Sequence, residues 1–141
     1  MLKFELRTGR GQFLIFIVTL FLISACAATR PAEQVTGERA IARWNALLAD
    51  DISSAYQYLS PGYRSSVSEK NYQRALLLKK VRWNDAEYIE SNCEETTCKV
   101  KISLKYTVFG AVPGLKSFDG TQTVEESWVL VDSNWYLVPD D

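Results

Sequence analysis

The stretch that decides the fold is residues 98–108, CKVKISLKYTV, in which apolar and polar side chains alternate without a break. Successive side chains of a strand point to opposite faces of its sheet, so a period of two predicts a β-strand with one buried and one solvated face. The expected buried face consists of Cys98, Val100, Ile102, Leu104, Tyr106 and Val108. The expected wet face consists of Lys99, Lys101, Ser103, Lys105 and Thr107.

Strand patterns continue on both sides of this stretch. Further strands are expected over residues 86–93, 121–131 and 135–138. The last two are separated by Asp132, Ser133 and Asn134, a composition typical of a hairpin turn. Residues 110–120, GAVPGLKSFDG, are expected to form a long hairpin loop.

Toward the N-terminus the period becomes helical. A first helix is expected after Thr36 as N-cap, with an apolar face of Ala40, Ile41, Trp44, Leu47 and Leu48. A second, short helix is expected after Asp51 and should end at residues 60–62, SPG, because proline cannot extend the helical hydrogen bonds. A third should begin after Ser68 and run to about Lys80.

Three helices followed by four antiparallel strands predict an α+β fold, with the sheet laid against a helical layer. The 141-residue length favours a single domain. We expect that domain to span residues 36–141, after a signal segment over residues 1–25 and a polar tether over residues 26–35, CAATRPAEQV.

The first segment has the three-part pattern of a secretory signal peptide. Lys3, Arg7 and Arg10 precede the apolar run 13–23, FLIFIVTLFLI, and small residues follow it. A transmembrane helix is the alternative, but the apolar stretch to Ala28 is shorter than the roughly 20 residues that a bilayer core requires.

Residues 23–26, ISAC, resemble the lipobox of bacterial lipoproteins, in which small residues lead into a cysteine. The resemblance implies cleavage before Cys26, a diacylglyceryl thioether on its sulfur and acylation of the new amino group, for instance by palmitate. Several acyl chains on one residue make a stable membrane anchor, whereas one chain holds only marginally. Ala27 stands where an aspartate would favour retention at the inner membrane, so we expect the outer membrane, facing the periplasm.

Cys93 and Cys98 flank the tip of an expected hairpin, with Glu-Glu-Thr-Thr between them. Export would place them in an oxidising compartment, and residues opposite each other on antiparallel strands have the separation that a disulfide needs. We therefore expect a structural disulfide. A redox-active pair is the alternative, although its usual spacing is C-x-x-C.

Composition excludes several classes of function. The chain has no histidine, which removes Ser-His and Cys-His nucleophiles and the usual zinc ligand sets. Its net charge of −1 argues against nucleic acid as a partner. We expect no cofactor and no metal.

The residues 44–51 (WNALLADD), 59–64 (LSPGYR), 126–128 (ESW) and 134–136 (NWY) resemble the nuclear transport factor 2-like superfamily, also called cystatin-like. The resemblance covers residues 36–138. It implies a strongly bent sheet wrapped on helices into a cone whose interior can hold a ligand. Enzymes of the superfamily, such as ketosteroid isomerase, place Asp, Tyr or His inside the cone. Here there is no histidine, and the strand residues expected to point inward are apolar or aromatic.

The candidate acidic residues each have a structural alternative. Asp51 is expected to cap the second helix while Asp50 lies in solvent. Glu125 and Glu126 lie in a strand, so only one can point into the cone, where burial would raise its pKa and allow general-base chemistry. Pairing with a lysine of the neighbouring strand is the more favoured interpretation.

Two further sets of residues are candidates for binding. Lys99, Lys101 and Lys105 form a row that is either the wet side of the sheet or a docking face for an acidic partner or anionic lipid. Aromatic residues either fill the core or line a pocket for an apolar ligand. The expected lining residues are Tyr56, Tyr63, Trp83, Tyr106 and Trp128.

The sequence therefore favours a lipid-anchored lipoprotein of the bacterial envelope with a non-catalytic interaction domain. Its expected partners are the membrane, through acyl chains on Cys26, and an envelope protein. The alternatives are a binder of a hydrophobic small ligand in the cone and an enzyme that uses Asp51, Glu125 or Glu126 as an acid or base. A contiguous apolar patch outside the core would favour the interaction domain.

Overall fold

The computed structural model describes residues 30–140, apart from the side chains of residues 111 and 112. The expected signal peptide and the lipidation site Cys26 lie outside the described residues. None of the described helices is long and apolar enough to cross a membrane. The elements follow in the order α2 (Ala32–Leu48), α3 (Ile52–Gln57), α4 (Pro61–Ser66), α5 (Glu69–Leu77), β1 (Val81–Cys93), β2 (Thr97–Val112), β3 (Leu115–Val131) and β4 (Asn134–Val138).

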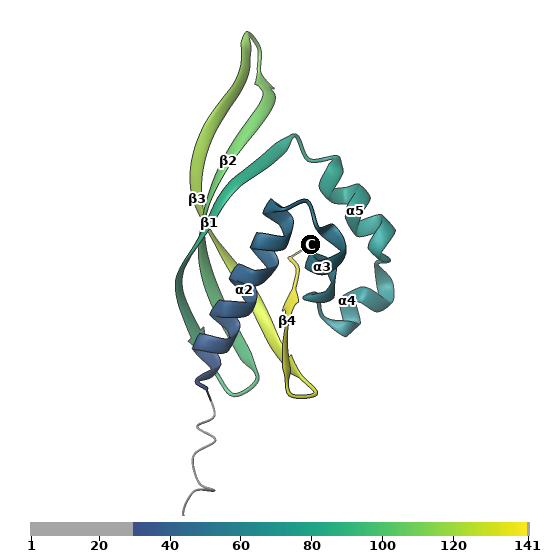
Figure 1. Cartoon of the computed structure of the whole chain (residues 1–141), viewed down its shortest axis with the longest axis vertical. Coiled ribbons are helices and arrows are strands. Elements are labelled where there is room, and N and C mark those ends of the chain that lie inside the picture. The colour runs from purple at the N-terminus through teal and green to yellow at the C-terminus, as the bar shows by residue number, and fades with distance from the viewer. Residues whose placement is uncertain (1–29, 141) are drawn as a thin grey trace, which may run out of the picture.

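The four strands form one antiparallel sheet in the order β1-β2-β3-β4, so each strand pairs with its neighbour in sequence. Figure 1 shows α2 lying along the sheet, with the short helices α3, α4 and α5 to one side and the hairpin of β2 and β3 projecting beyond all of them. Leu59, between α3 and α4, adds a single parallel bridge to Leu137 of β4. The helical segment is thereby attached to the β4 edge of the sheet.

The expected fold, three helices packed as a layer on a cone-like bent sheet, is wrong. There are four described helices, and α2 is the only long one, with 17 residues against six, six and nine in the others. The sheet dominates, because β1, β2 and β3 have 13, 16 and 17 residues. The structure is a four-stranded antiparallel sheet preceded by few and mostly short helices.

The extra helix arises at Pro61, which was expected to end a helix and instead begins α4. Proline is well tolerated at the first position of a helix, where its missing N–H would have no partner. The Ser60 hydroxyl accepts a hydrogen bond from the Tyr63 N–H and caps the new helix. Pro61 therefore separates two helices that are each only six residues long.

The first helix also begins earlier than expected. It starts at Ala32, directly after Pro31, so residues 32–35 of the expected tether belong to α2. Thr36 does not cap this helix: it is fully buried within it, and its hydroxyl donates to the Ala32 carbonyl at 2.8 Å. The third expected helix begins after Ser68 as predicted but ends at Leu77, before the expected end at about Lys80.

Residues 110–120 do not form a long loop. β2 and β3 extend through most of this stretch and leave a tight turn at Pro113 and Gly114. Gly110 and Gly114 have φ angles of 62° and 85°, which glycine adopts without steric cost. The register is irregular between Phe109 and Val112, where two residues of β2 stand opposite one of β3, so the hairpin absorbs one extra residue as a bulge.

Two other hairpin predictions are confirmed. Asp132 and Ser133 both have positive φ and join β3 to β4 directly after the pair Val131 and Asn134, as expected for a two-residue hairpin turn. Cys93 and Cys98 are partners in the register of β1 and β2 and form a disulfide.

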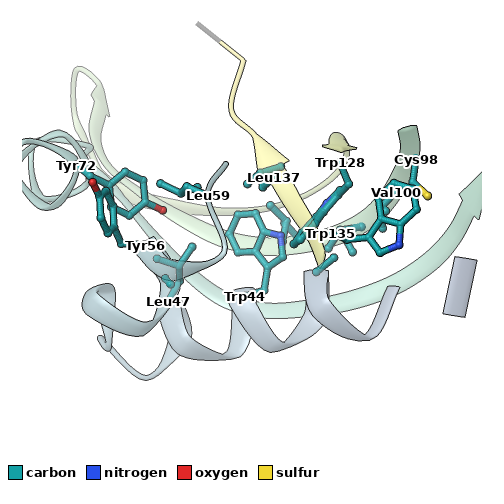
Figure 2. Packing of buried hydrophobic residues seen from close by; sticks show 14 residues of the cluster. Trp44, Leu47, Tyr56, Leu59, Tyr72, Cys98, Val100, Trp128, Trp135 and Leu137 are labelled. Atoms are coloured by element: carbon teal, nitrogen blue, oxygen red, sulfur yellow. The ribbon is translucent and has the colours of Figure 1, made fainter. Parts of the chain in front are cut away.

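The core lies between α2 and the inner face of the sheet. Trp44 and Leu47 of α2 point toward Trp128 and Leu137 of the sheet, and Tyr56 and Tyr72 close one end (Figure 2). Trp128 is fully buried, as are Val100 and Ile102 of β2. The even-numbered residues from Cys98 to Leu104 thus form the buried face that the alternation predicts.

Candidate functional site

A cluster of polar groups is buried within the core around Glu126 of β3. One oxygen of the Glu126 carboxylate, Oε1, accepts hydrogen bonds from Arg43 at 2.9 Å and from the Trp44 indole at 2.8 Å. The other, Oε2, accepts from the Trp128 indole at 3.1 Å. Arg43 also donates to the Tyr72 hydroxyl at 3.2 Å. We call these five residues the Glu126 cluster.

The cluster contains an ion pair that is almost removed from solvent. The side chains of Arg43 and Glu126 are 9 % and 8 % exposed. Burial raises the pKa of Glu126, while Arg43 and the two indole donors, from Trp128 and Trp44, act in the opposite direction. The net shift is upward, because removing the carboxylate from water outweighs the three favourable contacts.

Three donors of the chain hold Glu126, two on Oε1 and one on Oε2. These bonds connect α2 to β3 and fix the orientation of the carboxylate. A hollow of about 240 Å³ borders the cluster, and Lys79, Glu125 and Asp140 also line it. The Arg43 Nε atom is buried without a hydrogen-bond partner.

The other candidate acids lie on the surface. Glu125 points away from Glu126, as neighbours in a strand must, and its carboxylate is 3.8 Å from Lys99. Asp51 caps α3 by accepting from the Ser54 N–H at 3.0 Å, and the bonds from Ser54 lower its pKa. Asp50 is exposed in a left-handed conformation with φ 58°. Of the candidate acids, the structure brings Glu126 alone into the interior.

The lysine row on the outer face of the sheet is neutralised by carboxylates. Lys101 donates to Glu90 at 2.7 Å, and this bond raises the pKa of Lys101. Lys105 donates to Asp85 at 2.7 Å and lies 3.5 Å from Glu87. A face whose positive charges are paired in this way offers little attraction to an acidic partner.

The five expected lining residues do not share one cavity wall. Tyr56 and Trp128 are core residues, and Tyr63 packs against the core from α4. Trp83 meets Trp44 edge-on, with ring centroids 5.4 Å apart, and borders a hollow beside α5. Tyr106 lies over Gly120 of β3 and borders a separate hollow on the sheet.

An apolar groove of about 700 Å³ lies outside the core, between α2 and β1. We call it the α2–β1 groove. Its floor is one stripe of α2 and its wall is the ring of Tyr88, which is 44 % exposed. The lining residues are Pro31, Glu33, Gln34, Gly37, Glu38, Ile41, Ala42, Asn45 and Tyr88.

Gly37 allows the Tyr88 ring, which forms the wall of this groove, to lie against α2. A Cβ atom at this position would lie 2.6 Å from the Tyr88 ring, so the ring can rest on the helix only because residue 37 has no side chain. The groove runs beside β1, which pairs only with β2 among the described strands. The other edge of β1 leaves backbone N–H and C=O groups without a strand partner.

Sequence reasoning missed Arg43, Tyr72, Gly37 and Tyr88. Arg43 has a detectable signal, since it lies on the same helical stripe as Ala40, Trp44 and Leu47, where a charge needs a buried partner. Gly37 inside a helix is a second signal, because glycine there weakens the helix unless something packs against it. No local sequence pattern predicts that Tyr88 lies against α2.

No family model and no curated protein sequence matches this chain. Among solved structures, the fold is similar to the solution structure of a SEC-C motif containing protein from Rhodopseudomonas palustris, with a TM-score of 0.53 and 10 % sequence identity. The similarity covers 69 % of this chain and 70 % of the other. At this identity it concerns the fold alone and agrees with a dominant antiparallel sheet. The resemblance to the nuclear transport factor 2-like superfamily stays a prediction.

Proposed function

We propose that this protein is a lipid-anchored lipoprotein of the bacterial envelope whose domain is a non-catalytic interaction module. The observation that carries the proposal is the α2–β1 groove, an apolar surface outside the core that is bordered by an unpaired strand edge. Apolar grooves rimmed by polar side chains, here Glu33, Glu38 and Asn45, are typical of binding sites.

The groove fits an extended segment of an envelope protein. Such a segment can pair its backbone with the outer edge of β1, while alternate apolar side chains contact Tyr88 and Ile41. Backbone pairing provides affinity, and the groove selects apolar side chains on one face of the segment.

The position of the groove is consistent with attachment through Cys26. Pro31 lies at one end of the groove and is followed at once by α2. The chain from Cys26 to Pro31 spans at most about 18 Å when fully extended. An acyl anchor on Cys26 would therefore hold the groove close to the membrane surface, which we propose is the outer membrane facing the periplasm.

The Glu126 cluster supports a non-catalytic assignment. Its carboxylate is held by three donors of the chain, and Asp51 and Glu125 lie on the surface. The enzyme hypothesis would require one of these carboxylates to face a substrate cavity with a free oxygen.

A second candidate is the binding of an apolar small molecule in the same groove. Its volume of about 700 Å³ is within the usual range for small-ligand sites. This candidate is distinguished from the first by whether a macromolecule contacts the groove in cells.

Site-specific photo-crosslinking in intact cells tests the proposal. A photoreactive residue at position 41, in the groove, should give a discrete protein adduct, and Ala42→Lys should reduce its yield by placing a charge there. The control is the same residue at position 101, on the neutralised outer face. Absence of an adduct at position 41, or equal adducts at both positions, would contradict the proposal.

A further inference from the structure

One end of the molecule carries apolar side chains that the core does not use. Leu77 and Leu78, where α5 ends, are 71 % and 75 % exposed. Three further exposed apolar residues lie on the projecting hairpin of β2 and β3, and these are Phe109, Leu115 and Phe118. We call these five residues, with the basic residues of the same segments, the tip.

The two parts of the tip adjoin each other. The Phe109 N–H donates to the Lys80 carbonyl at 3.0 Å, which places the segment after α5 directly beside β2. The next residue, Val81, pairs with Val108, and Val108 pairs in turn with Phe118. In Figure 1 the segment after α5 meets the base of the projecting hairpin, and α2 begins at the opposite end of the long axis.

The tip is strongly basic although the whole chain is slightly acidic. Residues 74–82, RALLLKKVR, contain four basic side chains and no acidic one. Residues 106–118, YTVFGAVPGLKSF, contain Lys116 and no acidic residue. Among the described residues, none of the ion pairs involves Lys80, Arg82 or Lys116. These cations differ from the row Lys99, Lys101 and Lys105, which carboxylates neutralise.

We infer that the tip is a docking surface for an anionic lipid bilayer. Basic side chains without carboxylate partners are attracted to acidic headgroups, and exposed leucine and phenylalanine side chains enter the boundary between headgroups and acyl chains. Lysine is depleted at protein–protein interfaces, and three of the five basic residues of the tip are Lys79, Lys80 and Lys116, so its charged side chains favour a membrane over a protein partner.

The tip and the proposed acyl anchor would act as two separate membrane contacts. Because α2 begins at the end of the long axis opposite the projecting hairpin, engaging both contacts would orient the domain along the bilayer surface (Figure 1). The tip contact does not require acylation of Cys26, so it can be measured in a chain that lacks that residue.

The test is flotation with lipid vesicles of a chain that begins at Ala27. Such a chain keeps every described helix and strand, the whole core and the Cys93–Cys98 disulfide. It should float with vesicles of phosphatidylethanolamine and phosphatidylglycerol and remain in solution with vesicles of phosphatidylcholine alone. Raising the salt concentration should weaken the binding, since headgroup attraction is screened.

Two matched pairs of variants locate the contact. Lys80→Gln with Lys116→Gln should lower the bound fraction at least about tenfold, whereas Lys99→Gln with Lys101→Gln removes the same charge elsewhere and should leave it unchanged. Leu78→Ser with Leu115→Ser should also weaken binding, whereas Ile89→Ser should not. All four positions changed in the two tip variants are exposed, so the fold should be retained.

Several outcomes would overturn the inference. Absence of flotation with the anionic vesicles would do so, as would equal losses in the tip and control variants. If the tip variants instead abolished a protein adduct in cells without changing vesicle binding, the tip would be a protein interface. Failure of acylation at Cys26 would contradict the proposed anchor and leave the vesicle result standing.

Discussion

Arg43 of α2 and Glu126 of β3 form an ion pair with 2.9 Å between the guanidinium nitrogen and the carboxylate oxygen, although 83 positions separate them in the sequence. Both side chains are buried, and the indoles of Trp44 and Trp128 complete the shell of the carboxylate. The pair connects α2, the longest of the described helices, to the centre of the sheet. It therefore fixes how the two main parts of the fold meet.

Removing one partner of this pair should be costly. Arg43→Met leaves the Glu126 carboxylate buried without its cation, so we expect the free energy of unfolding to fall by about 3 kcal/mol. Urea unfolding measures the change. The control is Glu125→Gln, whose exposed ion pair should contribute less than about 1 kcal/mol.

A double-mutant cycle separates the pair from its surroundings. Arg43→Met together with Glu126→Gln should cost less than the sum of the two single changes, because no isolated charge remains. Additive losses would show that the two side chains do not stabilise the fold as a pair.

Glu126 should make stability depend on pH. Its pKa in the folded state is raised above the ordinary value of 4.5, so between those two values the folded chain holds a proton that the unfolded chain has released. The contribution of Glu126 to the free energy of unfolding is therefore fully present below its pKa in the unfolded chain. It is lost as the pH rises through its pKa in the folded chain. The stability of the native protein minus that of Glu126→Gln should decrease as the pH rises above the ordinary value of 4.5. An increase over this range would contradict the assigned shift.

Gly37 and Tyr88 should be energetically coupled. Gly37→Ala gains helix propensity but displaces the Tyr88 ring, so its net effect on stability should be small. In a Tyr88→Ala background the same change should stabilise by about 1 kcal/mol, because nothing then opposes the new methyl group. Thermal unfolding of the four proteins measures the coupling, and an identical effect of Gly37→Ala in both backgrounds would refute it.

The Cys93–Cys98 disulfide should contribute to stability through the short loop it closes. The chain-entropy relation gives about 2 kcal/mol for a loop of this size. Urea unfolding with and without a reducing agent measures the difference, and Cys93→Ser with Cys98→Ser provides a control that does not respond to the reductant. Unfolding that is equally unaffected by reduction in both proteins would contradict this role.

Local patterns predicted the local parts of the fold. The alternation around Ile102 marks both faces of β2, and Asp132 with Ser133 marks the final turn, because these signals depend on neighbours in sequence. Pro61 was misread because one proline can end a helix or begin the next, and the outcome depends on whether Ser60 caps it. Because Pro61 begins α4, the chain forms two six-residue helices there, and this is one reason why the expected helical layer is wrong.

The candidate sites depended on contacts that no local pattern describes. The sequence showed that only one of Glu125 and Glu126 can face inward, and the structure places Glu126 there. Its partner is Arg43 of α2 and not a lysine of the neighbouring strand, since Arg43 and Trp44 both reach this carboxylate from the helix. The α2–β1 groove likewise requires Gly37 and Tyr88 to meet across 51 positions of sequence.

The most direct test of the central claim is the mass of the N-terminal peptide of the protein extracted from cell membranes. We expect a chain that begins at Cys26 and carries a diacylglyceryl group on its sulfur and an acyl group on its amino nitrogen. The Cys26→Ser chain should lack these groups and leave the membrane fraction. A mature chain that begins at another residue, or an unmodified Cys26 in a protein that is still membrane-bound, would contradict the account.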